Sequence, residues 1–242
     1  MEKLEIKEIY EQIFDDCATG HLDADADIQM QYVLANISHD TNVRVLDAGC
    51  GDGNCAEYLW GKGYKKIVAV DLMDEIKAPN IEYICASIDK MPFENESFEN
   101  IYSLSVIFYL ENPESGLKEF YRCLRSGGVL VVSAHTKYSL FTLYRKFKLL
   151  VKPDSMKHLQ GVKFYSVSEY EKMLTKCGFK VVLKDGYRAS WLLSVIKGRL
   201  KWLDDALGTH FFDVKFEMTK NKWWALIKAI IAYHCIIVAR KD

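Results

Sequence analysis

Short apolar runs alternate with longer amphipathic segments through the middle of the chain. Five runs rich in Val, Ile and Leu are short enough to be strands: residues 43–47, 67–71, 81–85, 100–105 and 128–134. Helical patterns lie between them, at residues 54–62, 73–77 and 113–125. Strands that are apolar on both faces are typical of a parallel sheet covered by helices on each side. The pattern therefore predicts an α/β fold with a doubly wound, mostly parallel sheet, whose crossovers are right-handed.

A capped helix and two further strands follow after this regular alternation ends. The predicted helix begins at Ser166 or Ser168, has Glu169 in its first turn and ends at Cys177, before Gly178. Serine is a favoured cap, and glycine adopts the left-handed conformation that commonly ends a helix. Two more runs complete a seven-stranded sheet, at residues 179–184 and 235–239. Two helical patterns open the chain, at residues 2–17 and 26–38.

These elements divide the chain into a core and additions to it. We predict a helical N-terminal lid and a core interrupted by two helical cap insertions. About 45 residues separate the last two strands, far more than a hairpin needs, and long insertions on a sheet scaffold usually cover or build a binding site. The predicted lid is 1–40, the core is 41–136, 165–189 and 231–242, and the cap is 137–164 and 190–230.

Composition narrows the class of protein. The chain has 242 residues, 50% of them hydrophobic and 27% charged, which is ordinary for a globular protein. A formal net charge of −1 gives no overall reason to expect a nucleic-acid partner. The seven cysteines form no CxxC pair, so we expect no metal site and a reducing, cytoplasmic setting.

Two segments bear on targeting and membranes. The N-terminus has no apolar stretch of the kind that a secretory signal requires. Residues 223–239 are nearly all apolar, but Lys228 and His234 interrupt them. The run also falls short of the roughly 18 to 20 residues that span a bilayer. A buried helix followed by a core strand is predicted there.

A glycine-rich turn after the first predicted strand is the strongest chemical signal. Gly49, Gly51 and Gly53 stand at alternate positions, and Asp47 ends the strand before them. Glycines let the backbone pass close to a ligand, and a carboxylate accepts hydrogen bonds from amines and hydroxyls. Because this strand end borders the ligand crevice of a parallel sheet, the turn predicts a nucleoside-like cofactor. A tight connection with no ligand is the alternative.

A second carboxylate refines the cofactor. Asp71 ends the next strand, 24 residues after Asp47, where an acidic residue can bind a ribose diol. Asp71 alone fits NAD, another adenosyl cofactor or a solvated turn. The nicotinamide fingerprint is G-x-G-x-x-G facing a pyrophosphate, which the alternating glycines do not match. Asp47 and Asp52 would repel a pyrophosphate and suit a cationic, phosphate-free cofactor, which points to S-adenosylmethionine.

At this point a family resemblance is recognisable. The sequences VLDAGCGDGN and IVAVD resemble the first two motifs of class I S-adenosylmethionine-dependent methyltransferases. Residues 91–99, 117–128 and 176–179 are similar to later motifs of that family, in the same order. The resemblance covers residues 43 to about 185. It implies a Rossmann-like fold, S-adenosyl-L-methionine as cofactor, and methyl transfer as the activity.

The resemblance also implies roles for individual residues. Gly49 and Gly51 would approach the methionine part and Asp47 its amino group, while Asp71 would hold the ribose and Leu72 would pack on adenine. Many relatives have an acidic residue where this chain has Ser87, so the adenine amino group would meet a hydroxyl instead. The remaining candidate cofactor contacts are Cys50, Ile88 and Ser103.

Catalytic residues are harder to predict, because an activated methyl group needs mainly in-line placement of its acceptor. His135 and His158 are candidate bases. The run that begins at His158 resembles one in ubiquinone-pathway O-methyltransferases of the small-molecule type. The alternative is that each histidine is a surface or hydrogen-bonded loop residue. Tyr10 and Tyr109 are candidate pocket residues, although aromatics at helical spacing also serve as core.

Acceptor and partners are the least determined. Residues 102–109 lack the D/N-P-P-Y grouping of enzymes that methylate nucleic-acid amines, so we expect a small or lipid-like acceptor and an oxygen as the acceptor atom. Aromatic and basic residues mix in the cap, which predicts either weak contact with a membrane surface or a cap whose outer face is solvated. A non-catalytic binding or scaffold protein is the main alternative, and a nicotinamide oxidoreductase the lesser one. Acceptor identity and oligomeric state stay open.

Overall fold

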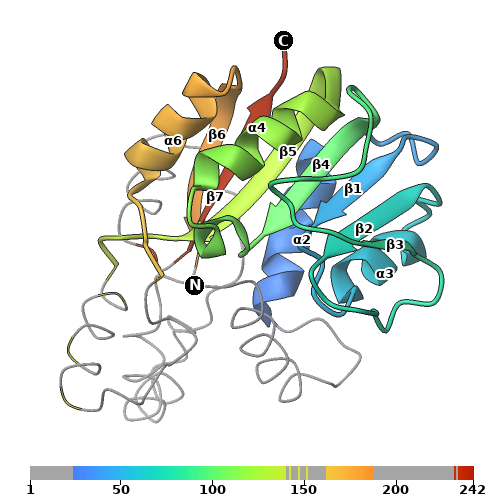
Figure 1. Ribbon diagram of the computed structural model, residues 1–242, viewed down its shortest axis with the longest axis horizontal. Helices are drawn as coiled ribbons and strands as arrows, with labels where there is room; N and C mark the ends of the chain where they lie inside the picture. Colours follow the sequence, from blue (N-terminus) through green and yellow to red (C-terminus); the bar gives the residue numbers. More distant parts are fainter. Residues whose placement is uncertain are drawn as a thin grey trace, which may run out of the picture.

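The computed structural model describes residues 24–139, 162–187 and 234–242, with isolated positions at 142, 147, 151 and 232. One sheet organises this part of the chain, with strand order β3-β2-β1-β4-β5-β7-β6 (Figure 1). The first five strands run parallel, and β7 is antiparallel to both β5 and β6. The predicted seven-stranded, mostly parallel sheet is confirmed. Its strands are β1 (Val45–Ala48), β2 (Ile67–Asp71), β3 (Glu82–Cys85), β4 (Phe98–Leu104), β5 (Leu124–His135), β6 (Lys180–Tyr187) and β7 (His234–Arg240).

Helices cover both faces of the sheet, as a doubly wound fold requires. Leu117 of α4 and Leu174 of α6 belong to the core on one face. Met30 of α2 and Leu59 of α3 belong to the core on the other. Figure 1 shows α4 and α6 on the near side and α2 and α3 behind the strands. The helices are α2 (Ala24–Asn36), α3 (Asn54–Gly61), α4 (Pro113–Cys123) and α6 (Val167–Lys176), with a 3-10 turn, η1 (Ile107–Tyr109).

The predicted ends of α6 are observed in detail. The Ser166 hydroxyl accepts a hydrogen bond from the Glu169 backbone N–H at 3.3 Å, and the Glu169 carboxylate accepts one from the Ser166 N–H at 2.7 Å. This reciprocal pair is a capping box, which satisfies two backbone donors that the helix itself cannot use. Gly178 follows the helix with φ +101°, in the left-handed region. Of the two candidate caps, Ser166 is therefore the one used.

The helix predicted at residues 73–77 is wrong. That segment consists of bends and irregular chain that runs beside the glycine-rich turn. The Lys77 N–H donates to the Asp52 carbonyl at 3.0 Å, and Ile76 and Ala78 lie against Gly53. The segment is bound to the turn instead of forming its own helical hydrogen bonds. Residues 137–139, at the start of the predicted helical cap insertion, form a turn and a bend instead, and Thr136 before them is paired to Tyr165.

Helix α2 is anchored on the sheet by polar contacts as well as apolar ones. The buried Tyr32 hydroxyl donates to Asp185 of β6 at 2.7 Å. The Ser133 hydroxyl of β5 donates to Gln29 at 2.7 Å. The predicted helix 26–38 is thus present as α2 and packs on the core. The earlier helix, 2–17, and most of the two cap insertions lie outside the described residues, so the division into lid, core and cap stays a prediction.

The last strand was predicted within the apolar run at 223–239. Strand β7 confirms that part of the prediction, whereas residues 223–231 lie outside the described part of the chain. Among the helices that the structure describes, none is long and apolar enough to cross a membrane.

A buried lysine near the C-terminus binds the chain to the core. Lys241 is 9% exposed, and its Nζ donates to the carbonyls of Tyr121 at 3.0 Å and Leu124 at 2.8 Å. The same ammonium lies 3.2 Å from the Glu96 carboxylate. These contacts join the end of the chain to the junction of α4 and β5.

We expect Lys241→Met to lower the free energy of unfolding by about 1–3 kcal/mol, because two buried carbonyls would lose their donor. Lys180→Met is the matched control: the Lys180 side chain is 69% exposed and lies 3.8 Å from Asp242, so its loss should change stability by less than about 0.5 kcal/mol. Urea unfolding followed by circular dichroism measures both. Equal effects of the two substitutions would contradict a fastening role for Lys241.

Candidate functional site

The predicted site residues meet at the carboxyl ends of the first four strands. A cavity there is lined by four segments, one after each strand. Gly49 follows β1, Asp71 and Leu72 close β2, Ser87 and Ile88 follow β3, and Tyr109 lies in η1 after β4. No lysine or arginine is among the lining residues that the structure describes. The lining therefore suits a ligand without phosphate groups.

The glycine-rich turn has the geometry that close approach of a backbone needs. Gly49, Gly51 and Gly53 have φ values of +86°, +55° and +86°, which L side chains rarely adopt. A Cβ on Gly49 would lie 2.5 Å from a methyl carbon of Val106, so no side chain fits there. The turn leads directly into α3, which begins at Asn54.

Asp71 is held by the backbone of the turn. Its Oδ2 accepts a hydrogen bond from the Gly51 N–H at 2.8 Å, and its Oδ1 accepts one from the Leu72 N–H at 2.6 Å. Burial raises the pKa of Asp71, while the N–H donors of Gly51, Leu72 and Met73 act in the opposite direction. A carboxylate oxygen has two lone pairs. Both oxygens can therefore still accept hydrogen bonds from a diol while the backbone fixes their position.

Asp47 is the more deeply buried carboxylate, at 2% exposed. Burial raises its pKa to about 8; the charges of Asp71 and Asp52 act in the same direction, and the hydrogen bond from Tyr102 opposes them. The Tyr102 hydroxyl donates to Asp47 Oδ2 at 2.9 Å. A cation placed nearby would favour ionisation of this group. Asp71 lines the cavity, whereas Asp47 is not among the lining residues. The charge of Asp71 nevertheless raises the pKa of Asp47, so the two groups act on each other, and no described lysine or arginine lines the cavity to compensate them. We call this cavity, together with the neighbouring Asp47, the acidic crevice.

The predicted adenine contacts line the same cavity. Leu72 and Ile88 present apolar side chains to it, and Ser87, 8% exposed, lies beside them. The Ser87 hydroxyl donates to the Asp89 carboxylate. With its proton committed to Asp89, the Ser87 oxygen offers its lone pairs to an amino group. An acidic residue is therefore close to the position where the sequence lacks one.

Beyond the crevice, one candidate base lies in an aromatic cluster. His135 is 8% exposed at the end of β5. Its ring centroid is 4.4 Å from that of Phe108 and 5.2 Å from that of Phe164. His234, its partner across β5 and β7, has a ring centroid at 4.1 Å. Tyr109 stands between this cluster and the crevice, with its ring 4.5 Å from Phe108, and burial raises its pKa to about 12.

The other candidates are placed less directly. Cys50 lies in the turn, and burial raises the pKa of its thiol, which keeps the thiol protonated. Ser103 is fully buried within β4 and is not among the residues that line the cavity. Tyr10 and His158 lie outside the described residues. Of the two candidate bases, only His135 has a described position.

Several residues of the site were missed by sequence reasoning. Tyr102 donates a hydrogen bond to Asp47, and Asp89 accepts one from Ser87. Val106 packs on Gly49, and the ring of His234 contacts that of His135. An available signal pointed to Asp89, because it is the acidic residue nearest to Ser87 in the chain. Tyr102 could have been suggested by its place on the strand next to β1. No local signal connects residues 135 and 234.

Comparison with known proteins agrees with this geometry. Residues 46–132 match the family described as a methyltransferase domain. Over 149 residues the chain is 27% identical to a tRNA U34 carboxymethyltransferase of Methylococcus capsulatus, covering 57% of this chain and 44% of that protein. It is 29% identical over 124 residues to a malonyl-[acyl-carrier protein] O-methyltransferase of Enterobacter lignolyticus, covering 49% of each. The chain spans about half the length of these relatives.

A solved structure extends the likeness of fold over nearly the whole chain. An S-adenosylmethionine-dependent methyltransferase of Thermotoga maritima, described as a possible histamine N-methyltransferase, superposes with a TM-score of 0.65. The match covers 98% of this chain and all of that one, at 19% sequence identity. At this identity the comparison concerns the fold.

The raised pKa of Asp47 predicts how Asp47→Asn changes stability with pH. An aspartate has a pKa near 3.9 when unfolded, so the folded protein binds the extra proton between about pH 4 and 8. Stability from this group is present at low pH and lost as pH rises toward 8. Relative to wild type, Asp47→Asn should gain up to about 1.4 kcal/mol per pH unit over that range, and nothing further above it.

Thermal unfolding at pH 6, 7, 8 and 9 measures this difference. Glu75→Gln, at an exposed position beside the turn, is the control and should show a flat difference. A flat difference for Asp47→Asn as well would contradict a raised pKa for Asp47.

Proposed function

Because the chain belongs to the class I S-adenosylmethionine-dependent methyltransferases, we propose that it transfers a methyl group from this cofactor to an oxygen of a small or lipid-like molecule. The observation that carries the proposal is the acidic crevice: two buried carboxylates, Asp47 and Asp71, at a glycine turn with no lysine or arginine in the described lining. S-adenosylmethionine has cationic groups, a ribose diol and no phosphate. The two carboxylates suit the cationic groups and the diol, and the lack of lysine and arginine in the described lining suits a ligand without phosphate.

The roles of the residues follow from their positions. Asp71, fixed by two backbone donors, would accept hydrogen bonds from the ribose hydroxyls. Asp47 would stabilise the positive charge of the amino-acid end, and Leu72 and Ile88 would enclose the adenine. Bound S-adenosylmethionine supplies an activated methyl group, so the protein has to orient the acceptor and exclude water. Cys50 and Ser103 are not among the described residues that line the cavity, so they would act only by supporting the turn and strand β4 that position those residues.

The acceptor would lie beside the crevice, at the ends of β4 and β5. There the rings of Phe108 and Phe164 lie against His135, and Tyr109 lies against Phe108. An aromatic setting favours an apolar or aromatic acceptor, and the imidazole would accept the proton that a hydroxyl loses. In the proposed cap, Tyr138, Phe147 and Val151 are more than 60% exposed. Exposed apolar side chains there support a lipid-like acceptor and contact with a membrane surface.

The relatives differ in what they act on, and this defines the competing acceptors. One is named for a tRNA and another for a malonyl group on a carrier protein. The net charge of −1 favours a small acceptor over a tRNA. His158 stays the second candidate base and Tyr10 a candidate pocket residue, and both lie outside the described residues. The six described cysteines are free thiols, which supports the proposed cytoplasmic location.

Asp71→Asn tests cofactor binding directly. The amide keeps the shape of the carboxylate but removes its charge and one acceptor position, so we expect affinity for S-adenosylmethionine to fall roughly tenfold to a hundredfold. Calorimetric titration measures it, with the exposed Asp40→Asn as the control. Wild-type protein that shows no binding would support a non-catalytic scaffold, and binding of NADH instead would support an oxidoreductase.

His135→Gln tests the proposed base. We expect the rate of methyl transfer to a hydroxyl acceptor to fall roughly a hundredfold or more, with cofactor affinity unchanged. The measurement is transfer of a labelled methyl group to panels of phenols, lipids, amines, malonyl carrier protein and tRNA. An unchanged kcat would assign His135 to packing. Labelling confined to amines or to tRNA would overturn the proposed oxygen acceptor while leaving the methyltransferase activity in place.

A further inference from the structure

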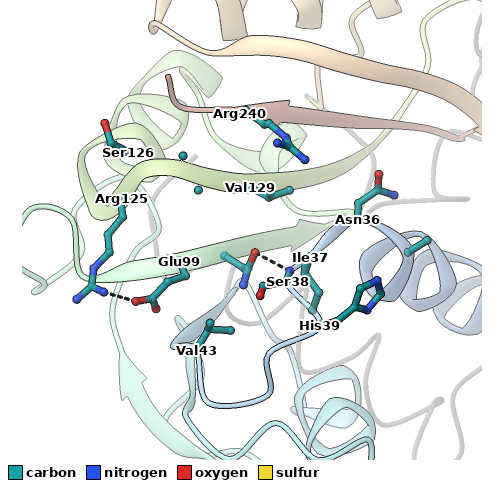
Figure 2. Close-up of a pocket in the computed structure, with 14 residues that line it drawn as sticks. Asn36, Ile37, Ser38, His39, Val43, Glu99, Arg125, Ser126, Val129 and Arg240 are labelled. Atoms are coloured by element: carbon teal, nitrogen blue, oxygen red, sulfur yellow. Dashed lines mark hydrogen bonds and ion pairs between the residues drawn. The ribbon is translucent and has the colours of Figure 1, made fainter.

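A second and larger cavity lies at the opposite ends of the strands from the acidic crevice. It has a volume of about 550 Å³, within the usual range of small-molecule sites. Figure 2 shows it between the turn that follows α2, the starts of β4 and β5, and the end of β7. We call this cavity the amino-edge groove, because it lies at the amino ends of the parallel strands. The groove residues that matter below are Ser38, His39, Glu99, Asn100, Arg125 and Arg240.

The one carboxylate among these residues already has its partners. Glu99 Oε1 pairs with the guanidinium of Arg125, as the dashed line in Figure 2 shows. Glu99 Oε2 accepts a hydrogen bond from the Arg44 backbone N–H at 2.7 Å. The negative charge on this side of the groove is therefore compensated within the protein.

Hydrogen-bond donors are left over. The Arg240 guanidinium and the His39 ring make no hydrogen bond or ion pair with any other described residue, and Figure 2 shows both side chains at the groove. Arg240 is exposed at the end of β7, where its charge remains available to a ligand. A site with surplus donors and an uncompensated guanidinium favours an anionic ligand, since arginine pairs with carboxylate and phosphate groups in a bidentate manner.

Asn100 gives an independent indication of the same chemistry. This side chain is 1% exposed, and its Oδ1 accepts a hydrogen bond from the Ser38 N–H at 3.3 Å. Its Nδ2 is buried and has no hydrogen-bond partner in the described part of the chain. A buried donor left unsatisfied costs about 1–3 kcal/mol. Asn100 also lines the groove. Its Nδ2 is closed off from water in this conformation, and a small displacement of the side chain would offer this unused donor to an acceptor atom in the groove.

We propose that the amino-edge groove is a binding site for a small oxyanion, a phosphate or carboxylate group, with Arg240 as its main charged contact and Asn100 as a further donor in the wall of the groove. The site is separate from the proposed methyltransferase reaction, because its residues lie at the other end of the same strands. Occupation of one site should therefore leave the other free.

The test is calorimetric titration of the full chain with inorganic phosphate, and then with acetate, in the presence of saturating S-adenosylmethionine. We expect saturable phosphate binding in the millimolar range, weakened roughly tenfold or more by Arg240→Gln. Asn100→Asp keeps the acceptor of Ser38 but places a second negative charge at the groove, and should weaken binding as well. Lys66→Gln removes an exposed cation outside the groove and should change nothing. Acetate that also binds would identify the shared carboxylate and phosphate chemistry, and acetate that does not would restrict the site to phosphate.

Three results would overturn the proposal. One is the lack of saturable binding of phosphate and acetate up to about 20 mM, a range that covers the expected affinity. Another is an equal loss in Arg240→Gln and Lys66→Gln, which would show a general effect of surface charge only. The third is competition between phosphate and S-adenosylmethionine, which would place the anion in the acidic crevice. Arg240→Gln should retain wild-type thermal stability and cofactor affinity, so failure of the groove and failure of the proposed function are distinguishable.

Discussion

Two carboxylates are buried at the ends of neighbouring strands, and the groups around them offset the cost of that burial. A buried carboxylate without partners is strongly disfavoured. Asp71 is supported by backbone N–H groups of the glycine turn and of its own strand end. Asp47 has a tyrosine hydroxyl from the next strand and a raised pKa. Near neutral pH the raised pKa keeps Asp47 largely protonated, and a bound cation would favour its ionisation. Sites of this kind commonly trade stability for function.

The parts of this arrangement that sequence could predict are those encoded locally. Asp47, the loop glycines and Asp71 belong to two short motifs, and the strands that carry them are continuous apolar runs. The capping box at Ser166 is likewise local. The failed helix at residues 73–77 shows the limit: its residues have helical spacing, but contacts with the glycine turn, 20 or more positions earlier, decide its conformation. Such contacts exist only after the sheet has formed.

The aromatic cluster at His135 could not be predicted from the sequence, because it too depends on contacts between residues far apart in the chain. His135 and His234 are register partners on antiparallel strands, although about 100 positions separate them in the chain. Phe108 and Phe164 join the cluster from η1 and from the segment before α6. No periodicity in the sequence links these positions. His135 and His234 meet because β7 is inserted between β5 and β6, which is a feature of the sheet topology and not of any motif.

The two candidate sites lie at opposite ends of the parallel strands, and the described charged groups left without an opposite charge differ in sign between them, which a net charge of −1 does not reveal. Parallel strands place all their carboxyl ends on one side, where Asp47 and Asp71 are buried. The starts of β4 and β5 and the end of the antiparallel β7 meet on the other side, where Arg125 and Arg240 lie. Because fields act locally and fall off within about 10 Å in physiological salt, a ligand at either edge responds to its own surroundings. Whole-chain charge therefore bears on a large polyanionic partner such as a tRNA, but it does not predict which small group binds at either end of the strands. The direction of the strands predicts that better.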